Sequence, residues 1–176
     1  MNLHEGLGLD GVHALTERQA TFALFHCCSS CLWARRVEVG RPYPSLAALL
    51  ERSDAVLAEL SEAEVDEALA GHPRIGERTT SASSRREQAG VVDAEPAVLA
   101  ALAAGNAQYE ARFGHVYLVH ADGRPAAELL DVLRERLRHD PATERAVVRR
   151  ELAAITRSRL TRLVEPVDWE AAAWAD

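Results

Sequence analysis

Apolar side chains recur every three or four positions along most of this chain, the spacing that places them on one face of an α-helix. The clearest stretch is 142–164, in which Val148, Leu152 and Ile155 follow one another at steps of four and three. Only the run 115–120 looks extended. The pattern predicts an all-α protein, a single-domain helical bundle of about seven to nine helices.

Capping signals set the boundaries of these helices. Thr16 with Gln19, and Ser61 with Glu64, have the spacing of capping boxes, and Gly71 is predicted to end a helix in the left-handed conformation. The expected helices are 22–39, 45–60, 61–70, 96–113, 125–138 and 142–164, with a short one carrying 85–88. The predicted division is a flexible N-terminal arm over 1–13, a helical domain over 14–165 and a C-terminal tail over 166–176.

Composition and charge narrow the function classes. The apolar residues are mainly Ala, Leu and Val with only 5% aromatics, which favours packed helices over a sheet. A net charge of -7 argues against a broad nucleic-acid or anionic-membrane surface, so an anionic substrate needs a local positive site. The chain shows neither an apolar run of about 20 residues nor a secretory signal, which predicts a cytoplasmic location.

Arg159 interrupts the apolar stripe of the last predicted helix. It stands four positions after Ile155 and four before Leu163, where a core residue is expected. A buried guanidinium without a partner is strongly unfavourable, so Arg159 must extend to solvent, pair with an internal carboxylate or line a cavity that receives an anion. The internal ion pair is the simpler interpretation, and the anion cavity is the functional one.

His72 is the second candidate, because it follows the helix-ending Gly71 and precedes Pro73, which restrains its backbone. Imidazole can donate and accept a proton near neutral pH. The alternative is a surface or cap histidine. Glu87 and Gln88 together could read the N–H and C=O groups of a urea-like ligand, although Ser84 with Glu87 also has the spacing of a capping box.

The rival cluster consists of Cys28 and Cys31 with Cys27 and His26 beside them. Two thiols at this spacing can ligate zinc or form a redox pair, but a complete zinc site needs more ligands, and packing inside a helix is the favoured interpretation of the thiols. The sequence contains no glycine-rich phosphate loop, nucleophile elbow or paired metal motif. It therefore favours chemistry without a nucleotide, a covalent serine intermediate or a metal.

An ordered set of short motifs carries a family resemblance. They are Cys28 to Trp33-Ala34, Arg41-Pro42, His72-Pro73-Arg74-Ile75-Gly76-Glu77, Ser84-Arg85-Arg86-Glu87-Gln88, Asn106, Tyr109, Phe113-Gly114, and Ile155 with Arg159-Leu160. In this order and spacing they resemble the 2-oxo-4-hydroxy-4-carboxy-5-ureidoimidazoline (OHCU) decarboxylases. The resemblance implies an all-helical homodimer that works without cofactor or metal and converts this small-molecule substrate to (S)-allantoin in urate breakdown.

The same resemblance implies roles for individual residues. His72, Glu87 and Arg159 match the family's catalytic side chains. The positions that match its substrate contacts are Pro73, Ser84 and Gln88, and the backbone of Leu118, Val119, His120 and Ala121. His115 and His120 stand where the family often has apolar or small residues.

Two other functions are compatible with these residues. The chain can be a non-catalytic helical binding or dimerisation module, in which Arg159 is merely paired and the His72-Pro73 turn is structural. It can also be a paralogous decarboxylase that acts on a related ureido-carboxylate.

Overall fold

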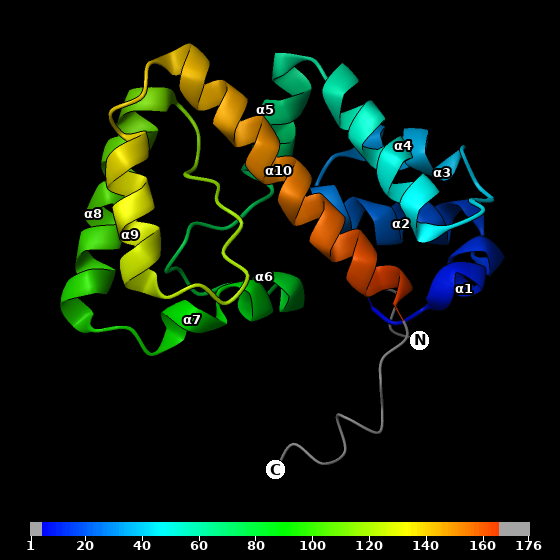
Figure 1. The fold of residues 1–176 in the computed structure, drawn as a ribbon, viewed down its shortest axis with the longest axis horizontal. Coiled ribbons are helices and arrows are strands. Elements are labelled where there is room, and N and C mark those ends of the chain that lie inside the picture. Colours follow the sequence, from blue (N-terminus) through cyan, green and yellow to red (C-terminus); the bar gives the residue numbers. More distant parts are fainter. Residues whose placement is uncertain (1–4, 166–176) are drawn as a thin grey trace, which may run out of the picture. The chain divides into compact units, whose positions relative to one another are not determined.

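The computed structural model describes residues 5–165, apart from the side chain of Val92, and within that range it contains ten helices and no strand (Figure 1). The prediction of an all-α protein is confirmed. The helices are α1 (Gly8–Ala14), α2 (Glu17–Cys28), α3 (Cys31–Glu38), α4 (Leu46–Glu59), α5 (Glu62–Ala70), α6 (Ala82–Glu87), α7 (Ala89–Val92), α8 (Pro96–Phe113), α9 (Ala126–Arg136) and α10 (Pro141–Val164).

The predicted caps begin their helices for the expected reasons. The side chains of Thr16 and Ser61 each accept the N–H of the third helical residue, and both capping boxes are complete. Gly114 ends α8 in the left-handed conformation with φ 79°. The same prediction is wrong for Gly71, whose φ is -84°, because its N–H bonds back to α5 through a tight right-handed turn that needs no positive φ.

The predicted helix 22–39 is two helices. Ser29, with φ 61°, ends α2, and the Ser30 side chain accepts the N–H of Trp33 to start α3. A polar pair inside an otherwise apolar run therefore breaks the helix, because the serine hydroxyl offers the backbone an alternative partner. This break, together with the short α1 and α7, raises the number of helices above the predicted range.

The flexible arm over 1–13 and the tail over 166–176 stay predictions, and residues 1–4 and 166–176 lie outside the described part of the chain, but α1 begins within the arm at Gly8. Val12 is buried, and the N–H groups of Gly6 and Leu7 donate to main-chain carbonyls of α10, at Arg162 and Leu163. A helix of seven residues with a single buried side chain is too short to produce a recognisable period, which is why the pattern did not reveal it.

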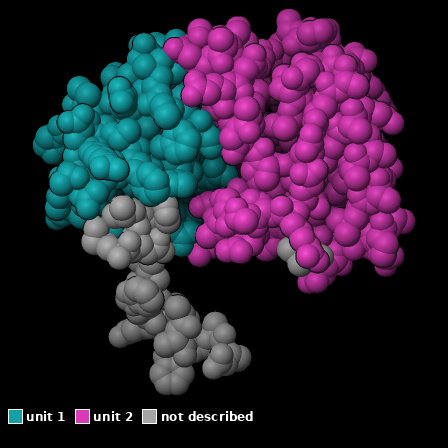
Figure 2. Space-filling model, turned by 180° about the vertical axis from the view of Figure 1, so that it is seen from behind, with its two compact units in different colours: residues 1–60, 156–176 teal, residues 61–155 magenta. Residues whose placement is uncertain are grey.

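The chain divides into two compact units, where the sequence predicted one domain without an internal boundary (Figure 2). Unit 1 comprises residues 1–60 and 156–176, and unit 2 comprises residues 61–155. One crossing falls between adjacent residues at 60 and 61, and the other lies inside α10. Neither crossing has a linker composition that a sequence pattern can detect.

In unit 1, α3 packs against both α2 and α4. Trp33 is fully buried, and its indole N–H donates to the main-chain oxygen of Ser53 at 3.2 Å. Ala20 and Ala23 on α2 and Ala34 on α3 are also buried, and such small side chains allow helices to pack closely.

In unit 2, α8 packs against α9 (Figure 1). A Cβ at Gly105 would lie 2.6 Å from the Leu133 side chain, so glycine permits this close approach. The core cluster around these helices also contains Tyr117, Val119 and Ala121, which places the extended segment 115–121 inside the packed unit. Across the described part of the chain, no helix is long and apolar enough to span a bilayer.

Candidate active site

His72 directly follows α5, and the end of that helix holds its ring. The imidazole Nδ1 lies 2.8 Å from the main-chain oxygen of Ala68, and the residue is only 6% exposed. Because a carbonyl oxygen can only accept, Nδ1 carries the proton in this contact. His72 thus caps α5 through one nitrogen, and its predicted catalytic role falls on the other.

Gln88 clamps the loop that carries His72. Its side-chain oxygen accepts the N–H of Gly76 at 2.9 Å, and its side-chain nitrogen donates to the main-chain oxygen of Arg74 at 3.3 Å. Pro73 lies half-buried in the same loop. The amide of Gln88 therefore first serves the protein backbone, and one hydrogen of its NH₂ group is left over for the predicted substrate contact.

Glu87 and Ser84 lie on α6, and the capping box predicted between them is wrong. The helix begins one turn earlier, because the Ser81 side chain accepts the N–H of Ser84 at 3.3 Å. Ser84 and Glu87 are 3% and 7% exposed, and helix capping does not account for the burial of either. A buried carboxylate is uncommon, which keeps the functional interpretation of Glu87 open.

Residues 115–121 form neither helix nor strand, and charged side chains bond to their main chain at Leu118 and His120. Arg136 donates to the main-chain oxygen of Leu118 at 2.6 Å, and Glu151 accepts the N–H of His120 at 2.7 Å. Val119, between these contacts, is 3% exposed, and its main-chain N–H and C=O have no partner among the described residues.

The turn that follows this segment, at residues 123 and 124, lies against α6 and α7. The N–H of Gly123 donates to the main-chain oxygen of Glu87 at 2.9 Å. Gly90 lets the turn come this close, since a Cβ there would lie 2.4 Å from the Gly123 oxygen and 2.5 Å from the Arg124 oxygen. Gln88 holds the His72 loop from the same place. Hydrogen bonds therefore link the three segments that carry nine of the ten predicted site residues.

The tenth, Arg159, lies in unit 1, on the C-terminal part of α10. It is 6% exposed, so the alternative in which it extends to solvent is wrong. Within unit 1 a hydrogen bond with the side chain of Thr156 and the positive charge of Arg159 each lower the pKa of the Cys28 thiol, against the larger effect of burial. A guanidinium held in an apolar helix face is suited to bind a carboxylate that loses its own hydration there.

The thiols do not form a shared site. Cys27 and Cys28 are buried, Cys31 is exposed and none of the three forms a disulfide. Burial raises the pKa of the Cys28 thiol to about 12, so this group is protonated at neutral pH and poorly nucleophilic. No cluster of three or more metal-binding side chains occurs within residues 5–165.

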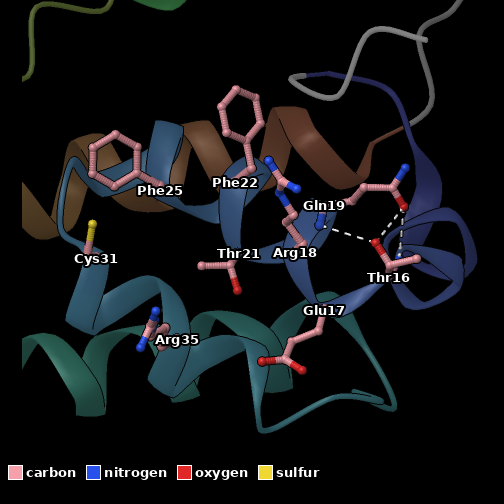
Figure 3. A pocket seen from close by; sticks show the side chains of 9 residues that line it. All are labelled: Thr16, Glu17, Arg18, Gln19, Thr21, Phe22, Phe25, Cys31 and Arg35. Atoms are coloured by element: carbon pink, nitrogen blue, oxygen red, sulfur yellow. Dashed lines mark hydrogen bonds between the residues drawn. The ribbon is translucent and has the colours of Figure 1, made fainter.

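Cys31 instead borders a surface pocket of unit 1, with a volume of about 1010 Å³. Figure 3 shows Phe22 and Phe25 along one side of this pocket, and the capping box of Thr16 and Gln19 at its end. None of the predicted site residues lines it.

Sequence analysis missed the ion pair of Arg136 and Glu144, which are 3% and 0% exposed. The signal was present. Arg136 comes three residues after Leu133 on the apolar face of α9, and Glu144 comes four residues before Val148 on the stripe that also contains Arg159. A charge on an apolar stripe identified Arg159, and the same test would have found these two.

Comparison with known proteins gives consistent results along most of the chain. Residues 13–161 match the sequence model of the OHCU decarboxylase family. A curated relative, the uric acid degradation bifunctional protein TTL of Arabidopsis thaliana, is 26% identical over 145 residues, which are 78% of this chain. The match covers 45% of that relative, so this chain spans about half its length.

Two solved structures share the fold. A crystal structure of OHCU decarboxylase in the presence of (S)-allantoin superposes with a TM-score of 0.71 at 26% identity, covering 80% of this chain and 95% of that one. A crystal structure of (S)-allantoin synthase also gives a TM-score of 0.71, covering 90% of this chain and 54% of that one. Its 15% identity supports the fold alone.

Proposed function

Because this chain belongs to the OHCU decarboxylase family, we propose that it removes carbon dioxide from 2-oxo-4-hydroxy-4-carboxy-5-ureidoimidazoline and yields (S)-allantoin. In urate breakdown this step follows urate oxidation and hydroxyisourate hydrolysis. The observation that carries the proposal is that hydrogen bonds tie the loop after His72 and the turn after residues 118–121 to Glu87 and Gln88, in a chain whose family is known. The solved relative crystallised with (S)-allantoin supports the product.

The substrate itself explains why few protein groups are needed. Its carboxylate sits on a carbon next to a C=N bond. When the bond to the carboxylate breaks, carbon dioxide leaves and the electron pair delocalises into the imine. One proton then completes the product. The imine serves as the electron sink, so we expect no metal or organic cofactor to take part.

In the proposed mechanism Arg159 orients the anionic substrate through charge-assisted hydrogen bonds from its planar guanidinium. His72 delivers the proton from Nε2 to one face of the carbanion, which determines the handedness of allantoin. The bond from Nδ1 to Ala68 supports this role, because it fixes the orientation of the ring. Glu87 stabilises the protonated ring.

The ureido group and the ring amides are proposed to bind the main chain of residues 118–121. Val119 supports this assignment, since its buried N–H and C=O offer one donor and one acceptor side by side. Pro73 and Ser84 complete the contacts. Gln88 contributes its remaining N–H, while its other groups hold the loop of His72.

The homodimeric state implied by the family resemblance also belongs to the proposal. Sedimentation of the purified chain should give twice the mass of 19.2 kDa. A monomer at micromolar concentration would contradict it. The cytoplasmic location stays a prediction.

Circular dichroism of freshly oxidised urate tests the activity directly. Urate oxidase and hydroxyisourate hydrolase supply the substrate, and addition of this protein should produce (S)-allantoin with a growing optical signal. His72→Asn should remove this gain, and His26→Asn, which changes an exposed histidine of α2, should keep it. A product that stays racemic with the wild-type protein would rule out the proposed function. A related ureido-carboxylate that reacts faster would identify a paralogous decarboxylase.

A further inference from the structure

Two charged side chains hold consecutive peptide groups of the extended segment. Arg136 Nη1 donates to the Leu118 oxygen at 2.6 Å, and Glu151 Oε2 accepts the N–H of His120 at 2.7 Å. They come from different helices, α9 and α10, and they contact the segment on either side of Val119. The two peptide groups that flank Val119 are therefore each held by a charged side chain, one by a cation and the other by an anion.

The geometry of the peptide group connects these contacts to Val119. The Leu118 carbonyl and the Val119 N–H belong to one planar trans peptide and point in opposite directions, as do the Val119 carbonyl and the His120 N–H. When Arg136 fixes the first oxygen, it also fixes the direction of the Val119 donor. When Glu151 fixes the His120 N–H, it fixes the Val119 acceptor in the same way.

The charges also strengthen these two groups. A cation at the carbonyl end of a peptide polarises it and makes its N–H a better donor, and an anion at the N–H end makes its carbonyl a better acceptor. Arg136 and Glu151 act on the peptides that flank Val119 with the signs that this requires.

Arg136 is itself held in place by a buried network. Its Nε and Nη2 donate to Glu144 Oε1 at 2.8 and 2.6 Å, and Tyr109 donates its hydroxyl proton to the same carboxylate. His139 lies 2.8 Å from the other carboxylate oxygen of Glu144. The guanidinium also lies 4.9 Å from the centre of the Tyr117 ring. These contacts leave Arg136 a single orientation.

A fully buried ion pair is seldom explained by stability. Desolvation of both charges cancels most of their attraction, and well-packed apolar side chains often replace such a pair at no cost. Apolar side chains, however, cannot hold the Leu118 carbonyl. If apolar side chains replaced Arg136 and Glu144, the peptide group of Leu118 and Val119 would no longer be held in its orientation.

We propose that Arg136, oriented by Glu144, and Glu151 are positioning residues that aim and polarise the N–H and C=O of Val119 for the amide groups of the substrate. This inference rests on the proposed function, in which the 118–121 backbone binds the ureidoimidazoline. Neither side chain takes part in the proton transfer, so their loss affects KM more than kcat.

Glu151 offers the cleaner test, because it is only half-buried. Glu151→Ala should raise KM about tenfold, the value of one hydrogen bond to a charged group, with little change in kcat. Glu151→Gln should recover most of the loss, since its amide oxygen can still accept the His120 N–H. Glu135→Ala, a change of an exposed glutamate on α9, is the matched control and should leave both constants unchanged. Equal KM values for Glu151→Ala and the wild type would overturn the inference.

The buried pair is tested with a triple variant, Arg136→Met with Glu144→Met and Tyr109→Phe, which removes the charges without leaving the tyrosine hydroxyl unpaired. It should stay folded with a lowered Tm, because the buried Leu118 oxygen loses its partner, and show a raised KM. A folded triple variant with the wild-type KM would overturn the role of Arg136. If the triple variant does not fold, the Glu151 series decides the inference by itself.

Amide hydrogen exchange separates this inference from the proposed function. Exchange of the His120 N–H should become faster in Glu151→Ala and return toward the wild-type rate in Glu151→Gln, with no substrate present. Unchanged exchange in Glu151→Ala overturns the positioning role. Wild-type protein that fails to decarboxylate the ureidoimidazoline overturns the proposed function instead, and the exchange result then stands independently.

Discussion

The candidate site residues of unit 2 form two groups that differ in the atoms they offer. The loop after α5 and the helix α6 provide side chains, chiefly His72 and Glu87. The segment 118–121 provides main-chain groups, and charged residues elsewhere in the unit hold it in place. The first group is defined by residue types. The second group consists of main-chain atoms, whose positions depend on the distant side chains that bond to them. A mutation can therefore change this group only by altering those supporting side chains.

This difference predicts two kinds of mutational effect. A change in the side-chain group removes a chemical step and lowers kcat. A change in the supports of the main-chain group displaces a donor and an acceptor by a fraction of an ångström, which weakens substrate binding and raises KM. The predictions below start with the largest effect.

His72→Asn should lower kcat by about 10² to 10⁴, the usual contribution of a general acid, because asparagine cannot exchange a proton near neutral pH. Steady-state decay of the ultraviolet signal of the substrate measures this loss, and circular dichroism of the protein checks that the helices are retained. A variant that keeps optically active product at the wild-type rate would remove His72 from the side-chain group.

Arg159→Lys should reduce kcat/KM by about 10- to 100-fold, since an ammonium keeps the charge and loses the planar pair of donors. Arg157→Lys is the matched control on α10, because Arg157 is exposed and pairs with Asp54. It should behave as the wild type. Equal kcat/KM values for the two variants would show that Arg159 is only an internal ion-pair partner.

Gly90→Ala should disturb the main-chain group without touching a charged residue. The added Cβ would meet main-chain oxygens at 2.4 and 2.5 Å, and backbone cannot move aside as a flexible side chain can. We expect a loss of about 1–3 kcal/mol in the free energy of unfolding and a raised KM.

Denaturant unfolding and steady-state kinetics measure the two effects of Gly90→Ala. Gly11→Ala is the control, because the nearest atom to its added Cβ is at an ordinary 3.4 Å and alanine favours the helix. It should leave KM unchanged and hold or improve stability. If Gly90→Ala has the wild-type KM, the contact of α7 with the turn at Gly123 does not affect substrate binding.

The smallest expected effect concerns the support of the His72 loop. Arg74 donates to Glu110 at 2.8 Å, and this contact holds the pKa of the Glu110 carboxyl below its ordinary value. A lowered folded-state pKa means that the pair stabilises the protein above the unfolded pKa and that this stabilisation disappears as the pH falls through the folded one. Glu110→Gln should therefore lower the Tm by about 2 °C at pH 7, and this difference should shrink as the pH falls through the folded-state pKa of Glu110. A difference that grows toward low pH would contradict this sign.

The two buried arginines show how far sequence reasoning extends into the site. Arg159 was recognised because it breaks a long apolar stripe, whereas Arg136 was overlooked in a shorter helix in which the same signal spans fewer turns. The capping box assigned to Ser84 and Glu87 was wrong because Ser81, one turn earlier, competes for the same helix start. When two serines three residues apart can each cap the same helix, the local sequence does not show which of them does so.

What the sequence by itself determined is the helical class, most helix boundaries and the family, because periodicity, capping residues and ordered motifs are local properties of the chain. The tertiary structure alone decided that Gln88 holds the His72 loop, that Gly90 admits the turn at Gly123 and that Arg136 and Glu151 flank Val119. These contacts join residues that are between 12 and 33 positions apart. The physical reason is that a peptide group has the same chemistry at every residue, so only packing determines which of them is left without a partner.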